Sequence, residues 1–354
     1  MHLPPAHPRR SSLSSSPFGS RPRALALAAG LVAAVTLTGC GTASGAGGAA
    51  PDSPEAASPD GPLTIDNCGF EVTFEEAPAR VVTIKSSAAE MLLALGLGDR
   101  IVGSAFLDGP VPEWLAEAAE GTPVADPFSD DVPGTEATLE LEPDLVYAGW
   151  ESNVTSEGAG DRDTLARLGV ATFVSPAACK TAGYMPDPLT FDGVFAEIEQ
   201  VGAIFGADDA AAALVAEQRA TLDAVVPDDR GLDALWYSSG DDIPYVGAGI
   251  GAPQMILDAV GLGNVAGGVQ DTWTPFAWEK VVDADPDVIV LVDAVWNSAD
   301  DKIARLESSP ATSQLTAVRE KRYLVVPFPA TEAGVRNVDA VAGLAEQLAE
   351  LNLP

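Results

Sequence analysis

Cations, hydroxyls and aromatic rings gather where the predicted β-strands of this chain end. Lys85, Ser86 and Ser87 follow an apolar run at 81–84, where the first amides of a helix would face an anion. Ligands of open α/β sheets bind beyond the carboxyl ends of the strands. That rule, with a polar loop and the start of the last helix added, selects ten more residues: Phe106, Trp150, Lys180, Tyr184, Ser239, Asp241, Trp273, Trp296, Phe328 and Arg336.

Aromatic plates with a few cations suit several classes of ligand, an anionic phosphorylated one among them. Arg336 suits two-point recognition of a carboxylate or phosphate. Each candidate also has a structural alternative. The aromatic rings can be core, Ser86 or Ser87 can cap a helix, and the cations can pair with acidic residues. Trp236 and Trp278 are expected in the core, and the remaining acids on a solvated face.

Catalytic chemistry finds little support in the sequence. The only histidines are His2 and His7, so the rest of the chain lacks the commonest general base and metal ligand. Glycines 247, 249 and 251 do not fit a dinucleotide fingerprint, and no phosphate-binding P-loop is present. We therefore expect no enzyme and no resident cofactor or metal, although serine or carboxylate chemistry stays open.

The charge of the chain excludes nucleic acid as a partner. There are 19 basic and 52 acidic residues. Four arginines and no acids precede Cys40, which leaves 15 against 52, a formal net charge of −37. Nucleic acid requires a basic surface. A local pocket can still oppose this global sign.

The first 62 residues predict export and anchoring. A basic front precedes an apolar run at 24–37, too short to span a bilayer, and the residues Leu-Thr-Gly-Cys end at Cys40. This resembles a lipoprotein signal at 1–39, with acylation of Cys40. A plain signal is the alternative, and Arg9-Arg10 leaves the twin-arginine export route open. Residues 40–62 are Gly-, Ala-, Ser- and Pro-rich and predict a flexible tether.

Two further cysteines, Cys68 and Cys179, remain for the exported part. In an oxidising exterior we expect them to form a disulfide. Two free buried thiols are the alternative. Such a bridge would contribute on the order of 4–5 kcal/mol by constraining the unfolded chain.

Apolar runs and helical patterns alternate from residue 63 onward. Strands are predicted at 81–84, 101–106, 144–148, 170–174, 232–237, 288–292 and 323–326. Helices are predicted at 88–97, 162–168, 191–205, 208–226, 253–260, 278–283 and 302–306. The pattern indicates an α/β fold of parallel βαβ units. We expect an N-terminal lobe at 63–206, a connecting helix at 207–228, a C-terminal lobe at 229–329 and a returning helix at 330–354.

An internal repeat supports two similarly built lobes. The segment EATLELEPDLV starts at Glu136, and EKVVDADPDVI starts at Glu279. In both, Pro-Asp opens an apolar strand seven residues after the glutamate. A second echo pairs residues 90–98 with 254–263 in the same order. Chance similarity of the helix-to-strand connections is the alternative.

Three segments together resemble the siderophore- and cobalamin-type periplasmic binding proteins. They are PARVVTIKSSAAEMLLALGLGDRIVG at 78–103, LEPDLVYA at 141–148 and VRN at 335–337, and the resemblance covers about residues 63–354. It implies two Rossmann-like lobes joined by one long helix, with the ligand between them. It also implies that Glu136 and Glu279 dock onto arginines of an ABC permease with its ATPase. Glutamates favoured at helix N-termini are the alternative.

A narrower subgroup is suggested by SPAACK at 175–180, YMPDP at 184–188 and WYSSG at 236–240. These stretches resemble actinobacterial proteins assigned to uptake of a deazaflavin precursor of the coenzyme F-420 type. Ferric siderophore, cobalamin and haem are the alternative ligands. We expect a monomer, held at the membrane by lipid on Cys40. A histidine-dependent metal receptor and a surface interaction module are the competing interpretations.

Overall fold

The fold is described from a computed structural model, which defines residues 61–185, 187–351 and 353. These residues belong to one unit, Glu55–Pro354. The predicted signal, Cys40 and nearly all of the tether lie outside the described residues. None of the helices in the described part has the length and apolarity that a bilayer crossing requires.

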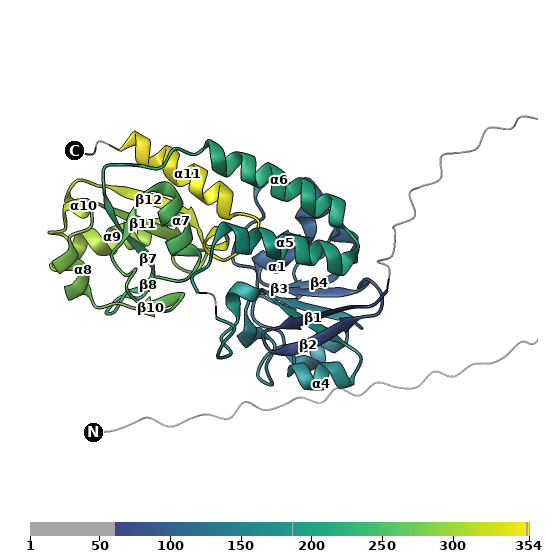
Figure 1. The fold of residues 1–354 in the computed structure, drawn as a ribbon. Helices are drawn as coiled ribbons and strands as arrows, with labels where there is room; N and C mark the ends of the chain where they lie inside the picture. The colour runs from purple at the N-terminus through teal and green to yellow at the C-terminus, as the bar shows by residue number, and fades with distance from the viewer. Residues whose placement is uncertain (1–60, 186, 352, 354) are drawn as a thin grey trace, which may run out of the picture. The chain divides into compact units, whose positions relative to one another are not determined.

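The first sheet has four parallel strands in the order β4-β3-β5-β6. Figure 1 labels β3 and β4. These are β3 (Val81–Ile84), β4 (Ile101–Ala105), β5 (Leu145–Ala148) and β6 (Ala171–Val174). Every residue of β3 and β5 is buried, as expected for parallel strands covered on both faces. All four strands were predicted from the sequence, to within one residue at each end.

Short helices and turns connect these strands. They are α1 (Ser86–Ala94), η1 (Gly98–Arg100), η2 (Glu113–Leu115), α2 (Ala116–Ala119), α3 (Thr135–Leu139), η3 (Glu151–Asn153), α4 (Arg162–Arg167) and η4 (Pro176–Ala178). Helix α1 begins two residues earlier than predicted, because Lys85 turns the chain directly from β3 into the helix with a φ of 83°.

A two-stranded hairpin, β1 (Leu63–Asn67) with β2 (Phe70–Phe74), precedes this sheet and was missed by the sequence analysis. Its strands alternate between half-buried and exposed residues. The turn residues Cys68 and Gly69 have φ angles of 55° and 85°, the left-handed values that two-residue hairpin turns require. A cysteine at the first turn position obscured this signal.

The second sheet follows the order β10-β8-β7-β11-β12, with β9 beside β7. The predicted strands are present as β7 (Asp233–Ser239), β11 (Val288–Asp293) and β12 (Tyr323–Pro327), and they run parallel. The expectation of parallel strands alone was incomplete. Strands β8 (Tyr245–Gly247) and β10 (Trp273–Pro275) add an antiparallel edge, and β9 (Gly263–Asn264) adds a short parallel pair. Runs of two or three residues carry no readable periodicity.

Helices α7 (Ala252–Val260) and α8 (Trp278–Ala284) begin and end within one residue of the predicted ranges, and α9 (Ala299–Ser308) is longer than predicted. The short helix α10 (Thr316–Arg319) and the turn η5 (Phe328–Thr331) were not predicted. The returning helix, α11 (Asn337–Glu350), is shorter than the predicted range. Trp236 is fully buried, as predicted, whereas Trp278 is only half-buried and donates its indole N–H to the Asp241 carbonyl at 2.9 Å.

The internal repeat is visible as matching local structure. Glu142 and Asp285, each six residues after its glutamate, both adopt a left-handed φ, of 47° and 41°. Asp144 then accepts hydrogen bonds from the amides of Ala79 and Arg80, while Asp287 accepts one from Asp233. In both halves this Asp therefore fastens the start of the neighbouring strand.

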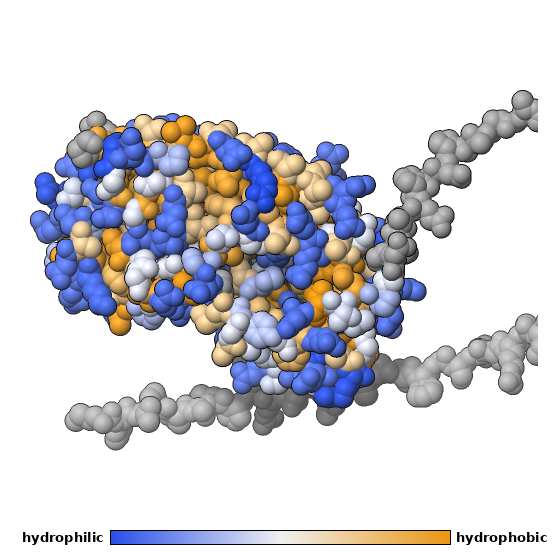
Figure 2. Space-filling model, viewed as in Figure 1, coloured by the Kyte–Doolittle hydropathy of each residue, from blue (hydrophilic) through white to orange (hydrophobic). Residues whose placement is uncertain are grey.

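Two long helices connect the sheets. Helices α5 (Phe191–Phe205) and α6 (Asp208–Ala224) pack together, and α6 also packs on α11 (Figure 1). Arg219 pairs with Asp192 at 2.8 Å, and Gln218 donates to the Val335 carbonyl at 2.8 Å. Helix α6 thus contacts both α5 and the segment that leads into α11. Hydrophilic residues cover much of the outer face, with apolar residues between them (Figure 2).

Candidate functional site

A cavity of about 390 Å³ lies between the two sheets. Residues from both halves of the chain line it. Many of them lie at the carboxyl ends of strands β5, β6, β7 and β12. Six predicted site residues line it: Trp150, Lys180, Ser239, Trp273, Trp296 and Phe328. Seven do not: Lys85, Ser86, Ser87, Phe106, Tyr184, Asp241 and Arg336.

Aromatic rings form much of the cavity wall. Tyr245 and Trp273 stack with ring centroids 6.4 Å apart and an angle of 11° between their planes. They come from the paired strands β8 and β10, so the antiparallel edge places both rings. Trp296 meets Phe328 edge-on at 4.9 Å and is 56% exposed. Rings that face an open cavity provide stacking surface for an aromatic or apolar ligand.

Tyr245 was missed by the sequence analysis. It begins a three-residue strand, which left no periodic pattern to read. Glu151, Thr272 and Glu332 were missed as well, because they lie in a short turn or in loops. Ser175 and Ser238, which follow or end predicted strands, do line the cavity, in agreement with the rule for strand ends.

Trp150 is held in place by two charged groups. Its indole N–H donates to Oε2 of Glu332 at 2.7 Å. The Nζ of Lys85 lies 3.7 Å from the centroid of its ring, and also within 4.9 Å of the rings of Phe106 and Phe328. Such cation–π contacts favour one ring orientation. The indole ring of Trp150 is therefore held in one orientation.

Lys85 itself does not reach the cavity, which corrects the expectation from the sequence. Its side chain is fully buried and forms an ion pair with Asp108. Gly149 is required beside it, since an added Cβ would lie 2.8 Å from the Cβ of Lys85. Lys85 instead contacts the rings of Phe106, Trp150 and Phe328 through cation–π interactions.

The N-terminus of α1 already holds an anion of the chain itself. The amide and hydroxyl groups of Ser86 contact Asp108, with 2.9 Å between the hydroxyl oxygen and the Asp108 amide. Burial raises the pKa of Asp108, and Lys85 opposes that rise. Ser86 is buried and Ser87 half-buried, and neither lines the cavity. The predicted anion site at this helix end is thus occupied by a side chain.

Three other predicted site residues bind partners away from the cavity. Arg336 is buried against Glu90, Tyr184 donates its hydroxyl to Asp66 at 2.7 Å, and Asp241 pairs with Arg305 at 2.7 Å. Phe106 packs edge-on against Trp150 at 5.9 Å. The sequence could not reveal these partners, because each is distant along the chain or lies in an irregular loop.

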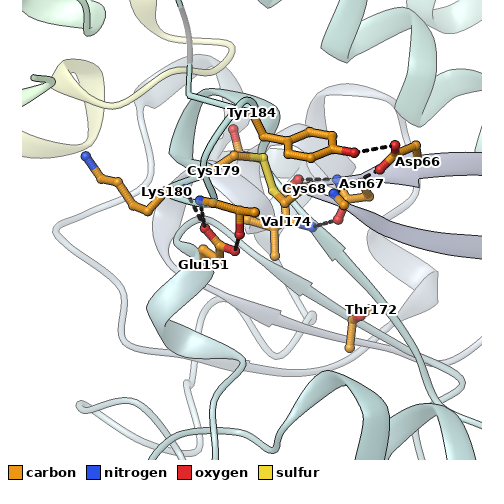
Figure 3. The surroundings of a disulfide bond; sticks show 12 residues. Asp66, Asn67, Cys68, Glu151, Thr172, Val174, Cys179, Lys180 and Tyr184 are labelled. Carbon is orange, nitrogen blue, oxygen red and sulfur yellow. Dashed lines mark hydrogen bonds between the residues drawn. A yellow bond between two sulfur atoms is a disulfide. The ribbon is translucent and has the colours of Figure 1, made fainter. Parts of the chain in front are cut away.

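Lys180 lies at the mouth of the cavity, on a loop fixed by the disulfide. Cys68 and Cys179 are bonded, with their Cα atoms 5.4 Å apart, as expected from the sequence (Figure 3). The carboxylate of Glu151 accepts from the amides of Lys180 and Thr181. The Lys180 side chain points away from the disulfide and reaches Asp271 at 3.1 Å and Thr272 at 2.8 Å. The loop thereby touches the second half of the chain.

Two buried carboxyl groups lie in or next to the cavity wall. Glu197 accepts a hydrogen bond from the hydroxyl of Ser175, a cavity-lining residue, at 3.0 Å. Burial raises the pKa of Glu197 to about 7. Oε1 of Glu332 is buried without a hydrogen-bond partner, and burial raises the pKa of this residue too. Across the described residues, no three His, Cys, Asp or Glu side chains are grouped as metal ligands.

Glu136 and Glu279 are both exposed in the first turn of a short helix, α3 and α8. The match in position follows from the internal repeat. Their geometry agrees with either a docking role or favourable placement at a helix N-terminus.

An α/β fold with two sheets and an aromatic-lined cavity between them defines a solute-binding architecture. The model of the periplasmic binding protein family matches residues 81–330, and the chain belongs to this family. The match spans the segment from β3 to η5, which includes nearly every element that lines the cavity.

Relatives share this architecture over most of their length. The chain is 28% identical over 331 residues to the uncharacterized ABC transporter substrate-binding lipoprotein YvrC of Bacillus subtilis, covering 91% of this chain and 95% of that protein. It is 30% identical over 274 residues to a cobalamin-binding protein of Halobacterium salinarum, covering 72% of this chain and 66% of that protein. The crystal structure of an ABC-type Fe3+-hydroxamate transport system from Saccharomonospora viridis is 28% identical, with a TM-score of 0.69 and coverage of 81% and 98%.

Proposed function

We propose that this protein captures a siderophore- or cofactor-class ligand outside the cell and delivers it to an ABC permease with its ATPase. The observation that carries the proposal is the aromatic-lined cavity of about 390 Å³ between the two sheets. Relatives named as an ABC transporter lipoprotein, a cobalamin-binding protein and an Fe3+-hydroxamate transport system support the same class. Lipid on Cys40 would hold the protein at the membrane as a monomer.

The ligand proposed from the sequence is a deazaflavin precursor. Flat rings would stack between Trp150, Trp273 and Trp296, and the serine hydroxyls at the end of β7 offer neutral hydrogen bonds. A ferric siderophore, cobalamin or haem would use the same aromatic surface. The aromatic walls support this whole group of ligands.

Thermal unfolding of the purified protein tests the proposal. The panel is a deazaflavin precursor, ferric siderophores, cobalamin and haem. A ligand at 100 times its dissociation constant stabilises the folded state by about 2.7 kcal/mol, which raises the melting temperature measurably. The absence of a shift with every compound would contradict the proposal.

Binding without conversion is part of the proposal. The recovered ligand should be chemically unchanged after incubation, which mass spectrometry of the released compound checks. Turnover of a panel compound would instead favour an enzyme that uses serine or carboxylate chemistry.

A further inference from the structure

Each cation that the sequence offered for an anionic ligand is paired with a carboxylate of the chain. Lys85 pairs with Asp108 beneath the aromatic rings. Lys180 pairs with Asp271 at 3.1 Å at the cavity mouth. The third is Arg336, whose Nε donates to Glu90 at 2.6 Å. Among the described residues that line the cavity, Lys180 is the sole cation.

The ionisable side chains that line the cavity are predominantly acidic. Lys180 is balanced by Asp271, whereas Glu151 and Glu332 are the two lining acids. Glu151 binds amides of the Lys180 loop. Glu332 receives one hydrogen bond, from Trp150, and its other oxygen has no partner among the residues that the structure describes. An anionic ligand would therefore add negative charge beside Glu332 with no free cation to balance it.

The charge of the whole chain acts in the same direction. Its formal net charge is −33. A cleft in a strongly acidic protein raises the local concentration of cations and lowers that of anions. The neutral polar groups of the cavity include the hydroxyls of Ser175, Ser238, Ser239 and Thr272. These groups suit carbonyl, hydroxyl and amide groups of a ligand.

We infer that the cavity selects an uncharged or cationic ligand with a flat or apolar face, and discriminates against phosphorylated cofactors and polyanionic iron chelates. This inference rests on the proposed function and narrows its ligand class. Aromatic stacking supplies affinity, while the carboxylates supply the discrimination through repulsion and desolvation.

Matched ligand pairs test the selection on the full protein. Riboflavin and its phosphate ester FMN differ by one phosphate group. The ferric tris-hydroxamate complex ferrioxamine B is cationic, and a ferric tris-catecholate complex is anionic. Dissociation constants by calorimetry or fluorescence quenching should favour the uncharged or cationic member of any pair that binds, by about tenfold or more. Equal or tighter binding of the anionic member would overturn the inference and leave the proposed function standing. If none of the four binds, the inference fails, whereas the proposed function is judged separately by the thermal unfolding panel, which also contains a deazaflavin precursor, cobalamin and haem.

A variant that releases the cation sharpens the test. In Asp271→Asn the side-chain oxygen can still accept from the Thr272 amide, which lies 2.7 Å from Oδ1 of Asp271. Lys180 loses its carboxylate partner. It should tighten binding of the anionic member by roughly twofold to tenfold and leave the uncharged member unchanged, because the pair is half-exposed. Asp192→Asn is the matched control, since it frees Arg219 on α6, away from the cavity. An unchanged ratio in Asp271→Asn, or an equal change in both variants, would overturn the inference.

Discussion

The guanidinium of Arg336 holds the carboxylate of Glu90 through two hydrogen bonds, across 246 residues of chain. It also donates to the Pro110 carbonyl at 2.7 Å. Glu90 belongs to α1 and Arg336 directly precedes α11. Both side chains are buried. The pair therefore ties the C-terminal segment to the first sheet's helix layer instead of facing a ligand.

Replacing Arg336 by alanine should lower stability and leave the cavity intact. The change leaves Glu90 buried without its partner, which costs roughly 3–5 kcal/mol for a buried ion pair. Thermal unfolding should show the loss. Affinity of the remaining folded protein for a panel ligand should stay within about threefold of the unmodified protein.

The double variant Glu90→Leu with Arg336→Leu provides the control. Apolar side chains of similar volume leave no isolated charge, so much of the stability lost in Arg336→Ala should return. A large loss of affinity in Arg336→Ala without a change in stability would restore the role that the sequence suggested.

Glu197 should make stability fall as the pH rises. Burial raises its pKa from 4.5 to about 7, against hydrogen bonds from Ser175 and Tyr147 that lower it. The folded state thus retains a proton that the unfolded state loses. Its contribution is complete below pH 4.5 and is lost as the pH rises to about 7, on the order of 3 kcal/mol.

Glu197→Gln removes this titration and keeps a polar side chain at the site. Urea unfolding at pH 4.5 and pH 7.5 should show that the variant loses less stability on raising the pH than the unmodified protein does. The same pH dependence in both proteins would contradict a protonated Glu197.

Loss of the disulfide should destabilise the first half of the chain. The bond joins residues separated by 111 positions, so its removal in Cys68→Ser with Cys179→Ser should cost about 2–5 kcal/mol. Thermal unfolding of this variant measures the cost. A reducing agent should lower the melting temperature of the unmodified protein and leave that of the variant unchanged. Equal stability with and without the bond would contradict the prediction.

Trp150→Ala should weaken ligand binding strongly. The ring is fixed by Lys85 and Glu332, so little ordering is required when a ligand stacks on it. Loss of such an aromatic anchor costs roughly 2 kcal/mol, about thirtyfold in affinity. Trp114→Ala is the control, because Trp114 bonds to Asp339 outside the cavity. Equal affinities in both variants would remove Trp150 from the site.

Glu136→Ala with Glu279→Ala should abolish uptake and keep ligand affinity. Both residues are exposed and neither lines the cavity, so the double variant should affect only docking onto a cationic permease surface. Transport of radiolabelled ligand by cells measures uptake, and a binding assay in solution measures affinity. Glu113→Ala with Glu320→Ala removes two other exposed acids as a control. Normal uptake in the first variant would refute the docking role.

The sequence determined the two parallel cores of the fold. Strands β3, β5 and β11 are nearly continuous apolar runs, and the repeat at Glu136 and Glu279 predicted the matching helix-to-strand connections. These signals are local, because a buried strand needs an apolar side chain at nearly every position. The antiparallel edge of β8 and β10 was beyond reach, since pairing between distant short segments fixes it.

The candidate site divides along the same line. Residue type placed three tryptophans around the cavity, with strand-end position for Trp150 and Trp296 and a polar loop for Trp273. The roles of the cations depended on tertiary structure, because a lysine or arginine can face a ligand or a distant carboxylate without any change in its local sequence. Folding brought Asp108 to Lys85, Asp271 to Lys180 and Glu90 to Arg336. The sequence by itself supplied the aromatic surface and the cations, and only the folded chain decided that those cations are neutralised, since charge pairing acts through space between residues far apart in the sequence.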